Sequence, residues 1–193
     1  MNAEYAAERP RRRIPIVTVV IFILNVIGLI YEYSVGQNAA VYRFAMYQGA
    51  LQDGQWVRLF VSAFLHFGIF HFGSNMVCLA VFGLDLENRT DWWRYALIYL
   101  AGIIGSGLLI NYTGGRGIHA GASGAIWALM TATLIFNLRN NINPMYALRG
   151  IVINLVYSFS AGVSWQGHIG GGVAGLLAAL VLTKDQNQAD NRR

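Results

Sequence analysis

The chain has 193 residues, of which 55% are hydrophobic and only 12% are charged. A soluble domain of this length carries about twice that share of charged residues, so the composition excludes an ordinary soluble protein and favours a membrane protein. The net charge of +5 does not indicate nucleic-acid binding, because the arginines are scattered between apolar runs and form no basic stripe with interleaved aromatic residues. The single cysteine, Cys78, excludes an internal disulfide framework.

Six apolar segments follow one another along the chain, and each is expected to be a membrane-spanning helix. They cover residues 14–31, 64–86, 92–110, 121–137, 144–159 and 165–183. The last three lie at or below the short end of the range of about 17 to 25 residues that crosses the hydrocarbon core. Arginines precede the first segment, as in a signal peptide. Its apolar stretch is too long and has no small-residue cleavage site, so we interpret it as a retained anchor helix.

The placement of basic residues predicts the orientation. With the N-terminus in the cytoplasm, only Arg43, Arg58 and Arg116 of the 14 lysines and arginines fall on the outer side, and the other 11 fall on the inner side. This follows the positive-inside rule, so both termini are expected to be cytoplasmic. The predicted organisation is a basic segment over residues 1–13, a six-helix domain over residues 14–183 and a polar tail over residues 184–193.

The connection after the first helix, residues 34–63, is unusually long and rich in aromatic residues. Aromatic side chains favour the boundary between lipid and water, so this outer loop is expected to lie at the membrane interface.

Polar side chains gather near the outer ends of three predicted helices. His71 and Asn75 lie in the outer half of the second segment, Ser123 near the outer end of the fourth and His168 near the outer end of the sixth. Such side chains are costly in hydrocarbon, so each is a candidate functional residue. His71 and Asn75 are four residues apart and share a helix face, whereas His66, five residues before His71, is expected to point elsewhere.

Small residues accompany both Ser123 and His168. Gly171 and Gly175 fall on the helix face of His168, and Ser123 sits within Gly121-Ala122-Ser123-Gly124. Glycine on a helix face allows another backbone to approach closely, which a hydrogen bond between this serine and this histidine requires.

Each candidate also has a structural interpretation. A serine in a membrane helix usually bonds to its own backbone, a lone histidine is usually a structural hydrogen-bonding group or a proton relay, and Asn75 could join two helices. The catalytic interpretation rests on the combination of these residues at one depth.

The combined pattern resembles the rhomboid family of intramembrane serine proteases. The resemblance is carried in chain order by Trp56-Val57-Arg58, His66-x4-His71-x3-Asn75, the Gly-x-Ser-Gly motif Gly121-Ala122-Ser123-Gly124, and His168-x2-Gly171-x3-Gly175. One variation is Trp127, four residues after Ser123, where many bacterial members have tyrosine.

The resemblance implies an all-α fold, a bundle of six transmembrane helices with the long first outer loop at the interface. It implies that Ser123 is the nucleophile and His168 the general base. The backbone N–H of Ser123 would form an oxyanion hole with the side chains of His71 and Asn75.

The resemblance further implies supporting roles around that dyad. His66 and Arg58 would be structural supports, and Trp127 would pack against the imidazole of His168. No carboxylate is expected at this depth, because Glu32 and Asp53 are assigned to the long loop and its approach, so a dyad is predicted rather than a triad.

The expected partner is a single-pass transmembrane protein, cleaved near the outer face after its helix unwinds locally. The approach to His168, residues 158–167, is expected to be the mobile cap that admits substrate. No metal, nucleotide or redox cofactor and no nucleic acid is expected. The expected location is a bacterial cytoplasmic membrane, with the oligomeric state left open.

Other classes of membrane protein fit these residues less well. A zinc protease requires a His-Glu-x-x-His string, which is missing, and an aspartyl protease requires two intramembrane aspartates, whereas only Asp85 comes near. A rhomboid-like protein that binds membrane helices without cutting them remains an alternative. A transporter or proton relay would use His71 and His168, but the inverted repeats and intramembrane carboxylates typical of such proteins are not evident.

Overall fold

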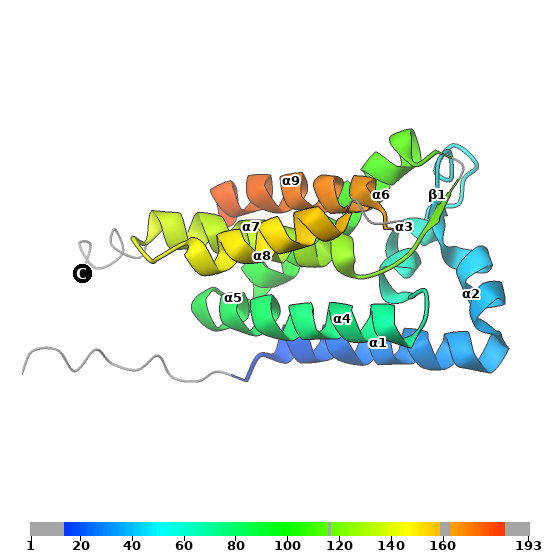
Figure 1. The fold of residues 1–193 in the computed structure, drawn as a ribbon, viewed down its shortest axis with the longest axis horizontal. Coiled ribbons are helices and arrows are strands. Elements are labelled where there is room, and N and C mark those ends of the chain that lie inside the picture. Colours follow the sequence, from blue (N-terminus) through cyan, green and yellow to red (C-terminus); the bar gives the residue numbers. More distant parts are fainter. Residues whose placement is uncertain (1–13, 116, 159–162, 184–193) are drawn as a thin grey trace, which may run out of the picture.

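Helices make up nearly all of the chain that the structure describes, and most of them lie side by side along one direction (Figure 1). The computed structural model describes residues 14–115, 117–158 and 163–183. The predicted flanking segments, residues 1–13 and 184–193, lie outside these residues. The long single helices are α1 (Ile16–Val35), α6 (Trp92–Thr113), α7 (Ser123–Arg139), α8 (Met145–Ser158) and α9 (Trp165–Leu182).

The second apolar segment forms a continuous helical stretch with an irregular centre. It consists of α4 (Ile69–Cys78), the π-helical turn η2 (Leu79–Gly83) and α5 (Leu84–Arg89). The stretch begins later than the predicted residue 64, because Gly68 adopts a φ of 92°, a conformation that interrupts a helix and that suits glycine. Conversely, α1 runs past the predicted residue 31 and ends before Gly36, whose φ is 91°.

Four helical stretches among the described residues are long and apolar enough to cross a membrane, namely Ile16–Val35, Ile69–Arg89, Trp92–Thr113 and Trp165–Leu182. The helix α7 has 17 residues and the apolar helix α8 has 14. The prediction of an all-α membrane bundle is therefore confirmed, and the count of six membrane-crossing helices stays a prediction.

The long connection predicted over residues 34–63 is folded. It contains the helices α2 (Gln37–Phe44) and α3 (Val57–Val61), the short strand β1 (Met46–Tyr47) and the 3-10 turn η1 (Ser62–Phe64). Strand β1 pairs antiparallel with β2 (Ile118–His119), with Met46 opposite His119. Because β2 closely precedes α7, this pairing ties the long connection to the start of α7. Its position at a membrane interface stays a prediction.

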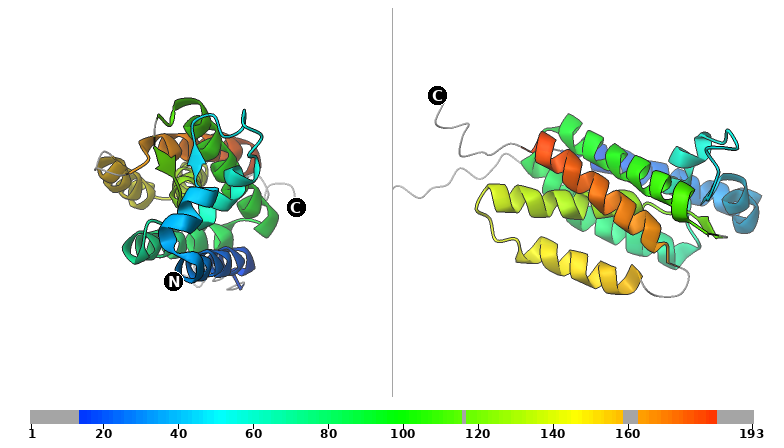
Figure 2. Two further views of the ribbon diagram at one scale, coloured as in Figure 1. Left: turned by 90° about the vertical axis from the view of Figure 1, so that its right-hand side faces the viewer. Right: turned by 90° about the horizontal axis from the view of Figure 1, so that it is seen from above.

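Helix α7 is the central helix of the bundle and is buried along most of its length. Glycines of α6 let the backbone of α6 approach α7 and α9 closely. A Cβ atom at Gly102 would lie 2.6 Å from the Cβ of Ala128 in α7, and one at Gly105 would lie 2.4 Å from the Cβ of Ala174 in α9. The three helices α6, α7 and α9 therefore form the tightly packed core. The view from above in Figure 2 shows α8 at one side of the bundle.

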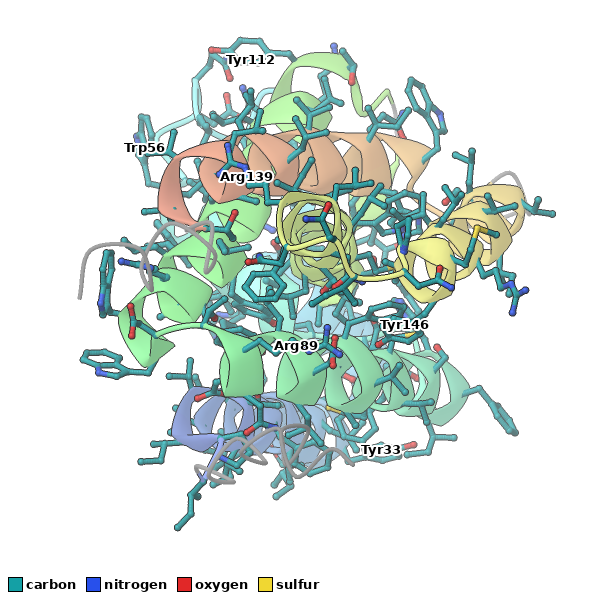
Figure 3. The ribbon with its side chains drawn as sticks, turned by 90° about the vertical axis from the view of Figure 1, so that its left-hand side faces the viewer. Tyr33, Trp56, Arg89, Tyr112, Arg139 and Tyr146 are labelled. Carbon is teal, nitrogen blue, oxygen red and sulfur yellow. The ribbon has the colours of Figure 1, made fainter. Side chains whose placement is uncertain are left out.

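The two ends of the bundle differ in character. One end carries α2, β1 and α3, and the opposite end is where α5, α7 and α9 finish (Figure 1). That second end holds Arg89 and Arg139, both labelled in Figure 3. The Arg139 side chain donates to the carbonyl oxygen of Thr183 at 2.7 Å and so caps α9. The side of the bundle that faces the cytoplasm stays a prediction.

Candidate active site

Ser123 and His168 are joined by a hydrogen bond between two different helices. Ser123 is the first residue of α7 and His168 lies in the first turn of α9, and the Ser123 Oγ is 2.9 Å from the His168 Nε2. Gly121 turns the chain into α7 with a φ of 137°, a value that side chains of L-residues rarely adopt. The hydroxyl therefore sits at a helix start, where the first backbone N–H groups have no partner one turn earlier.

The close approach of α7 and α9 depends on glycines. A Cβ atom at Gly171 would lie 1.9 Å from the carbonyl oxygen of Gly124, and one at Gly175 would lie 2.3 Å from the Cα of Ala128. Gly124 itself faces Ser106, whose hydroxyl oxygen would be 2.3 Å from an added Cβ. These predicted supporting glycines thus allow the two backbones to touch near the Ser–His pair.

The imidazole of His168 has contacts on one ring face and at both ring nitrogens. Trp127, one turn after Ser123, stacks on it with the ring centroids 5.5 Å apart and an interplanar angle of 22°. The His168 Nδ1 lies 2.5 Å from the hydroxyl oxygen of Ser158, the last residue of α8. No local pattern in the sequence singles out Ser158, because the contact depends on how α8 lies against α9.

His71 is oriented by a backbone hydrogen bond. The N–H of Phe67 donates to the His71 Nδ1 at 3.2 Å. Since this nitrogen accepts, the neutral ring carries its proton on Nε2, which is then a donor. That Nε2 lies beside Gly121, because a Cβ atom there would be only 3.0 Å from it. His71 therefore presents an N–H close to the turn that carries Ser123.

Asn75 lies one turn after His71, and the two residues line one cavity. Its side-chain N–H₂ group donates to the carbonyl oxygen of His71 at 2.8 Å. Since an amide nitrogen has two hydrogens, one remains for a second acceptor.

The structure corrects the prediction for His66. This residue precedes α4 instead of lying in it, so helical spacing does not set its direction. Its ring meets the ring of His71 edge-on at a centroid distance of 5.2 Å, whereas the sequence predicted that the two point apart. Its backbone is held on both sides: the N–H donates to the Glu32 carboxylate, and the carbonyl oxygen accepts from the Gln37 side chain at 3.2 Å.

Glu32 was predicted to belong to the long loop and its approach, but it is a fully buried residue of α1. A carboxylate therefore does lie at this end of the bundle. It contacts the backbone of His66, and no hydrogen bond between it and His168 is found among the described residues. The third group that contacts the histidine of the Ser–His pair is thus a hydroxyl, that of Ser158.

Arg58 organises the long connection. Its guanidinium donates to the carbonyl oxygens of Ala45 at 2.7 Å and Tyr42 at 3.1 Å, and also to the side chain of Gln55. Beside it, the hydrogen bond from the Tyr47 hydroxyl to Asp53 raises the pKa of that tyrosine. These contacts hold the segment before β1.

A cavity of about 460 Å³ opens beside the Ser–His pair. It lies between α4, α7, α8 and the start of α9, and its lining includes His71, Asn75, Ser123, Trp127 and His168. His119 also lines it, and burial lowers the pKa of this imidazole. The cavity is large enough for an unwound peptide segment, so it is the candidate binding site.

A second space of about 30 Å³ adjoins Ser123 and is bordered by the hydroxyl-bearing residues Ser62, Ser106 and Ser164. A cavity of this size and polarity can hold one water.

The predicted mobile cap, residues 158–167, is described in part, because residues 159–162 lie outside the described residues. In the described part, the Ser164 hydroxyl accepts from the backbone N–H of Gly167 at 3.2 Å and caps the start of α9. Within the described chain no group of three or more His, Cys, Asp or Glu side chains is arranged to hold a metal ion.

The arrangement combines a hydroxyl, an imidazole bonded to it and N–H donors around one cavity, which are the components of nucleophilic acyl transfer. A family model described as the Rhomboid domain matches residues 53–185, which include all of these groups. Rhomboid-type serine protease 2 of Emericella nidulans is 33% identical over 156 residues, which are 75% of this chain and 31% of that relative.

Two further relatives give the same result. RHOMBOID-like protein 1 of Arabidopsis thaliana is 34% identical over 148 residues, 70% of this chain and 38% of the relative. Rhomboid protease GluP of Bacillus subtilis is 34% identical over 139 residues, 68% of this chain and 27% of the relative. The chain spans about a third of the length of these relatives. Since the domain match covers more than half of the sequence, the chain is a multi-pass membrane protein of the rhomboid family.

Proposed function

We propose that this protein is an intramembrane serine endopeptidase in which Ser123 and His168 act as a catalytic dyad. The observation that carries the proposal is the 2.9 Å hydrogen bond between the Ser123 Oγ and the His168 Nε2 at the wall of the 460 Å³ cavity. Membership of the rhomboid family supports it, as do relatives named as serine proteases.

The reaction begins when the Ser123 Oγ attacks the carbonyl carbon of the scissile peptide bond, and its proton passes to the His168 Nε2. The carbonyl oxygen becomes an oxyanion, which accepts hydrogen bonds from the Ser123 backbone N–H, the His71 Nε2–H and the Asn75 amide. These donors are fixed before the reaction, which lowers the barrier because little reorganisation is needed.

The intermediate then collapses. The carbon–nitrogen bond breaks, and His168 gives its proton to the leaving amine, so the new N-terminus departs and an ester to Ser123 remains. A water attacks this ester and gives a proton to His168. The bond to the Ser123 Oγ then breaks, the Oγ takes the proton back from His168, and the carboxylic acid product is released. The 30 Å³ space at Ser123 is suited to supply that water.

The proposed substrate is a single-pass transmembrane protein. The carbonyl groups of a helix are occupied by its own hydrogen bonds, so the substrate has to unwind before it can enter the cavity. Glycine or proline near the cleavage site lowers the cost of unwinding by about 1 to 3 kcal/mol per residue relative to alanine. Cleavage is proposed near the end of the bundle that carries α2 and β1, which faces outward if the arginine-rich end is cytoplasmic.

The experiment is cleavage of a tagged single-pass substrate by the purified protein in detergent, with Ser123→Ala beside it and no metal or nucleotide added. The expected result is loss of the product in Ser123→Ala. Thermal unfolding is measured to establish that both proteins are folded. If neither protein cleaves the substrate and neither reacts with a fluorophosphonate, the alternative of a rhomboid-like protein that binds helices without cutting them replaces the proposal.

A further inference from the structure

Ser158, the last residue of α8, contacts the proposed catalytic base, so its role rests on the proposed function. Its hydroxyl oxygen has two polar neighbours: the carbonyl oxygen of Asn154 at 2.7 Å and the His168 Nδ1 at 2.5 Å. A carbonyl oxygen only accepts hydrogen bonds, so the single hydroxyl hydrogen of Ser158 points to Asn154. The bond to His168 must then run the other way, with the Nδ1–H of the ring donating to Ser158.

This direction determines which tautomer of His168 is present. A neutral imidazole carries one proton, so a proton on Nδ1 leaves Nε2 with a free lone pair. Nε2 is the atom that lies 2.9 Å from the Ser123 Oγ and has to accept its proton. The opposite tautomer would present an N–H to Ser123 and could not act as a base. A group at Nδ1 that accepts but does not donate thus favours the reactive form.

The contact is shielded from solvent. Ser158 is 2% exposed and His168 is 5% exposed. A buried Nδ1–H without an acceptor carries the full cost of its desolvation, so loss of the Ser158 oxygen removes the reason for the proton to stay on Nδ1.

The two halves of α8, the helix that ends at Ser158, have different surroundings. The first half of α8 is fixed to η2: Tyr146 stacks on Phe82 at 5.2 Å and donates to the carbonyl oxygen of Val81 at 3.1 Å. In the second half, Ile153 and Asn154 border the large cavity. The Ser158–His168 bond joins this half to α9.

We infer that Ser158 is a positioning residue that holds the proton of His168 on Nδ1 and couples the place of α8 to the reactivity of Ser123. It takes the place that a carboxylate has in a Ser-His-Asp triad, but without a charge. Because a hydroxyl orients the ring and does not stabilise the imidazolium by charge, its contribution is smaller than the about 10⁴-fold of a triad carboxylate.

The test compares Ser158→Ala and Ser158→Thr with the wild type in the purified full chain. The matched control is Ser34→Ala. Ser34 lies near the end of α1 and its hydroxyl also bonds to a carbonyl oxygen of its own helix, but the residue is exposed and away from the cavity. Three measurements are made: steady-state kinetics with a transmembrane substrate, which give kcat and KM, thermal unfolding, and the ¹⁵N shifts of the His168 ring. The ¹⁵N shifts report which nitrogen carries the proton whether or not the protein is active.

Ser158→Ala is expected to lower kcat roughly tenfold, since both tautomers then compete, with little change in KM or unfolding temperature. Its Nδ1 signal is expected to shift from the protonated toward the unprotonated position. Ser158→Thr keeps the hydroxyl and is expected to recover most of the rate, and Ser34→Ala is expected to match the wild type.

An unchanged kcat and ¹⁵N spectrum in Ser158→Ala would overturn the inference. So would a loss of activity that follows the unfolding temperature and is not recovered by Ser158→Thr, because that result indicates packing alone. A wild type that neither cleaves nor reacts with a fluorophosphonate would instead overturn the proposed function, so the two failures are distinguishable.

Discussion

Gly171 of α9 lies directly against Gly124 of α7, and an added Cβ at Gly171 would be 1.9 Å from the Gly124 carbonyl oxygen and 2.6 Å from its carbonyl carbon. One turn before Gly171, His168 bonds to Ser123, the neighbour of Gly124. The backbone contact and the Ser–His hydrogen bond are therefore set by the same spacing between two helices. A change in that spacing has to move the imidazole relative to the hydroxyl.

Substitution of Gly171 by alanine is accordingly expected to abolish fluorophosphonate labelling of Ser123. Alanine gains about 1 kcal/mol of helix propensity over glycine, but overpacking against backbone atoms that cannot rotate away costs about 1 to 3 kcal/mol or more and separates the helices. Gly172→Ala is the matched control, because a Cβ atom at Gly172 would lie 3.4 Å from its nearest neighbour, the Trp127 ring, which is an ordinary contact distance. Labelling of Gly171→Ala at the wild-type rate would show that the helix spacing does not control the dyad.

The proposed oxyanion hole predicts a loss in kcat when its donors are removed. His71→Ala is expected to lower kcat by about 10² to 10³, the range for loss of one such donor, with a smaller change in KM. Asn75→Ala is expected to have the smaller effect, because its amide is already shared with the carbonyl oxygen of His71. Steady-state kinetics on a transmembrane substrate would measure both, and a His71→Ala enzyme with normal kcat would exclude His71 from the oxyanion hole.

Trp127 is expected to act through its ring rather than through its N–H. Its Nε1 is buried and has no hydrogen-bond partner among the described residues, so Trp127→Phe removes no bond while it keeps a ring against His168. This variant should keep most of the kcat. Trp127→Ala removes the ring and is expected to lower kcat and to destabilise the fold by about 3 to 5 kcal/mol. A large loss of kcat in a stable Trp127→Phe variant would point to a role for the indole N–H.

Glu32 is expected to stabilise the segment before α4. In Glu32→Leu the buried N–H of His66 loses its acceptor, which costs about 1 to 3 kcal/mol, whereas Glu32→Gln keeps an oxygen at that place. Thermal unfolding should therefore rank the wild type and Glu32→Gln above Glu32→Leu. If Glu32→Leu unfolds at the wild-type temperature, the contact makes no net contribution to stability.

Local patterns in the sequence predict much of the fold. Apolar runs predicted where the long helices lie, because burial in lipid demands continuous apolar sequence. Helical spacing put His71 and Asn75 on one face, and the glycines beside Ser123 and His168 indicated the close contact of their helices. The structure brings these four side chains to one cavity, and their catalytic roles remain proposals.

What could not be predicted depends on contacts between elements. His66 faces His71 because Gly68 starts the helix later than the apolar run suggests. Glu32 is buried because α1 runs further than its apolar segment, and its charge made it look like a loop residue. Ser158 meets His168 only through the relative placement of α8 and α9, which no spacing along the chain encodes.

The most direct test of the dyad is to map the site of fluorophosphonate attachment by mass spectrometry in the wild type, in His168→Ala and in Ser123→Ala. A fluorophosphonate reacts with a serine only when a base activates the hydroxyl, so it reports on chemistry without a choice of substrate. We expect a single adduct on Ser123 in the wild type and none in either variant. An adduct on another serine, or one on Ser123 that persists in His168→Ala, would contradict the dyad.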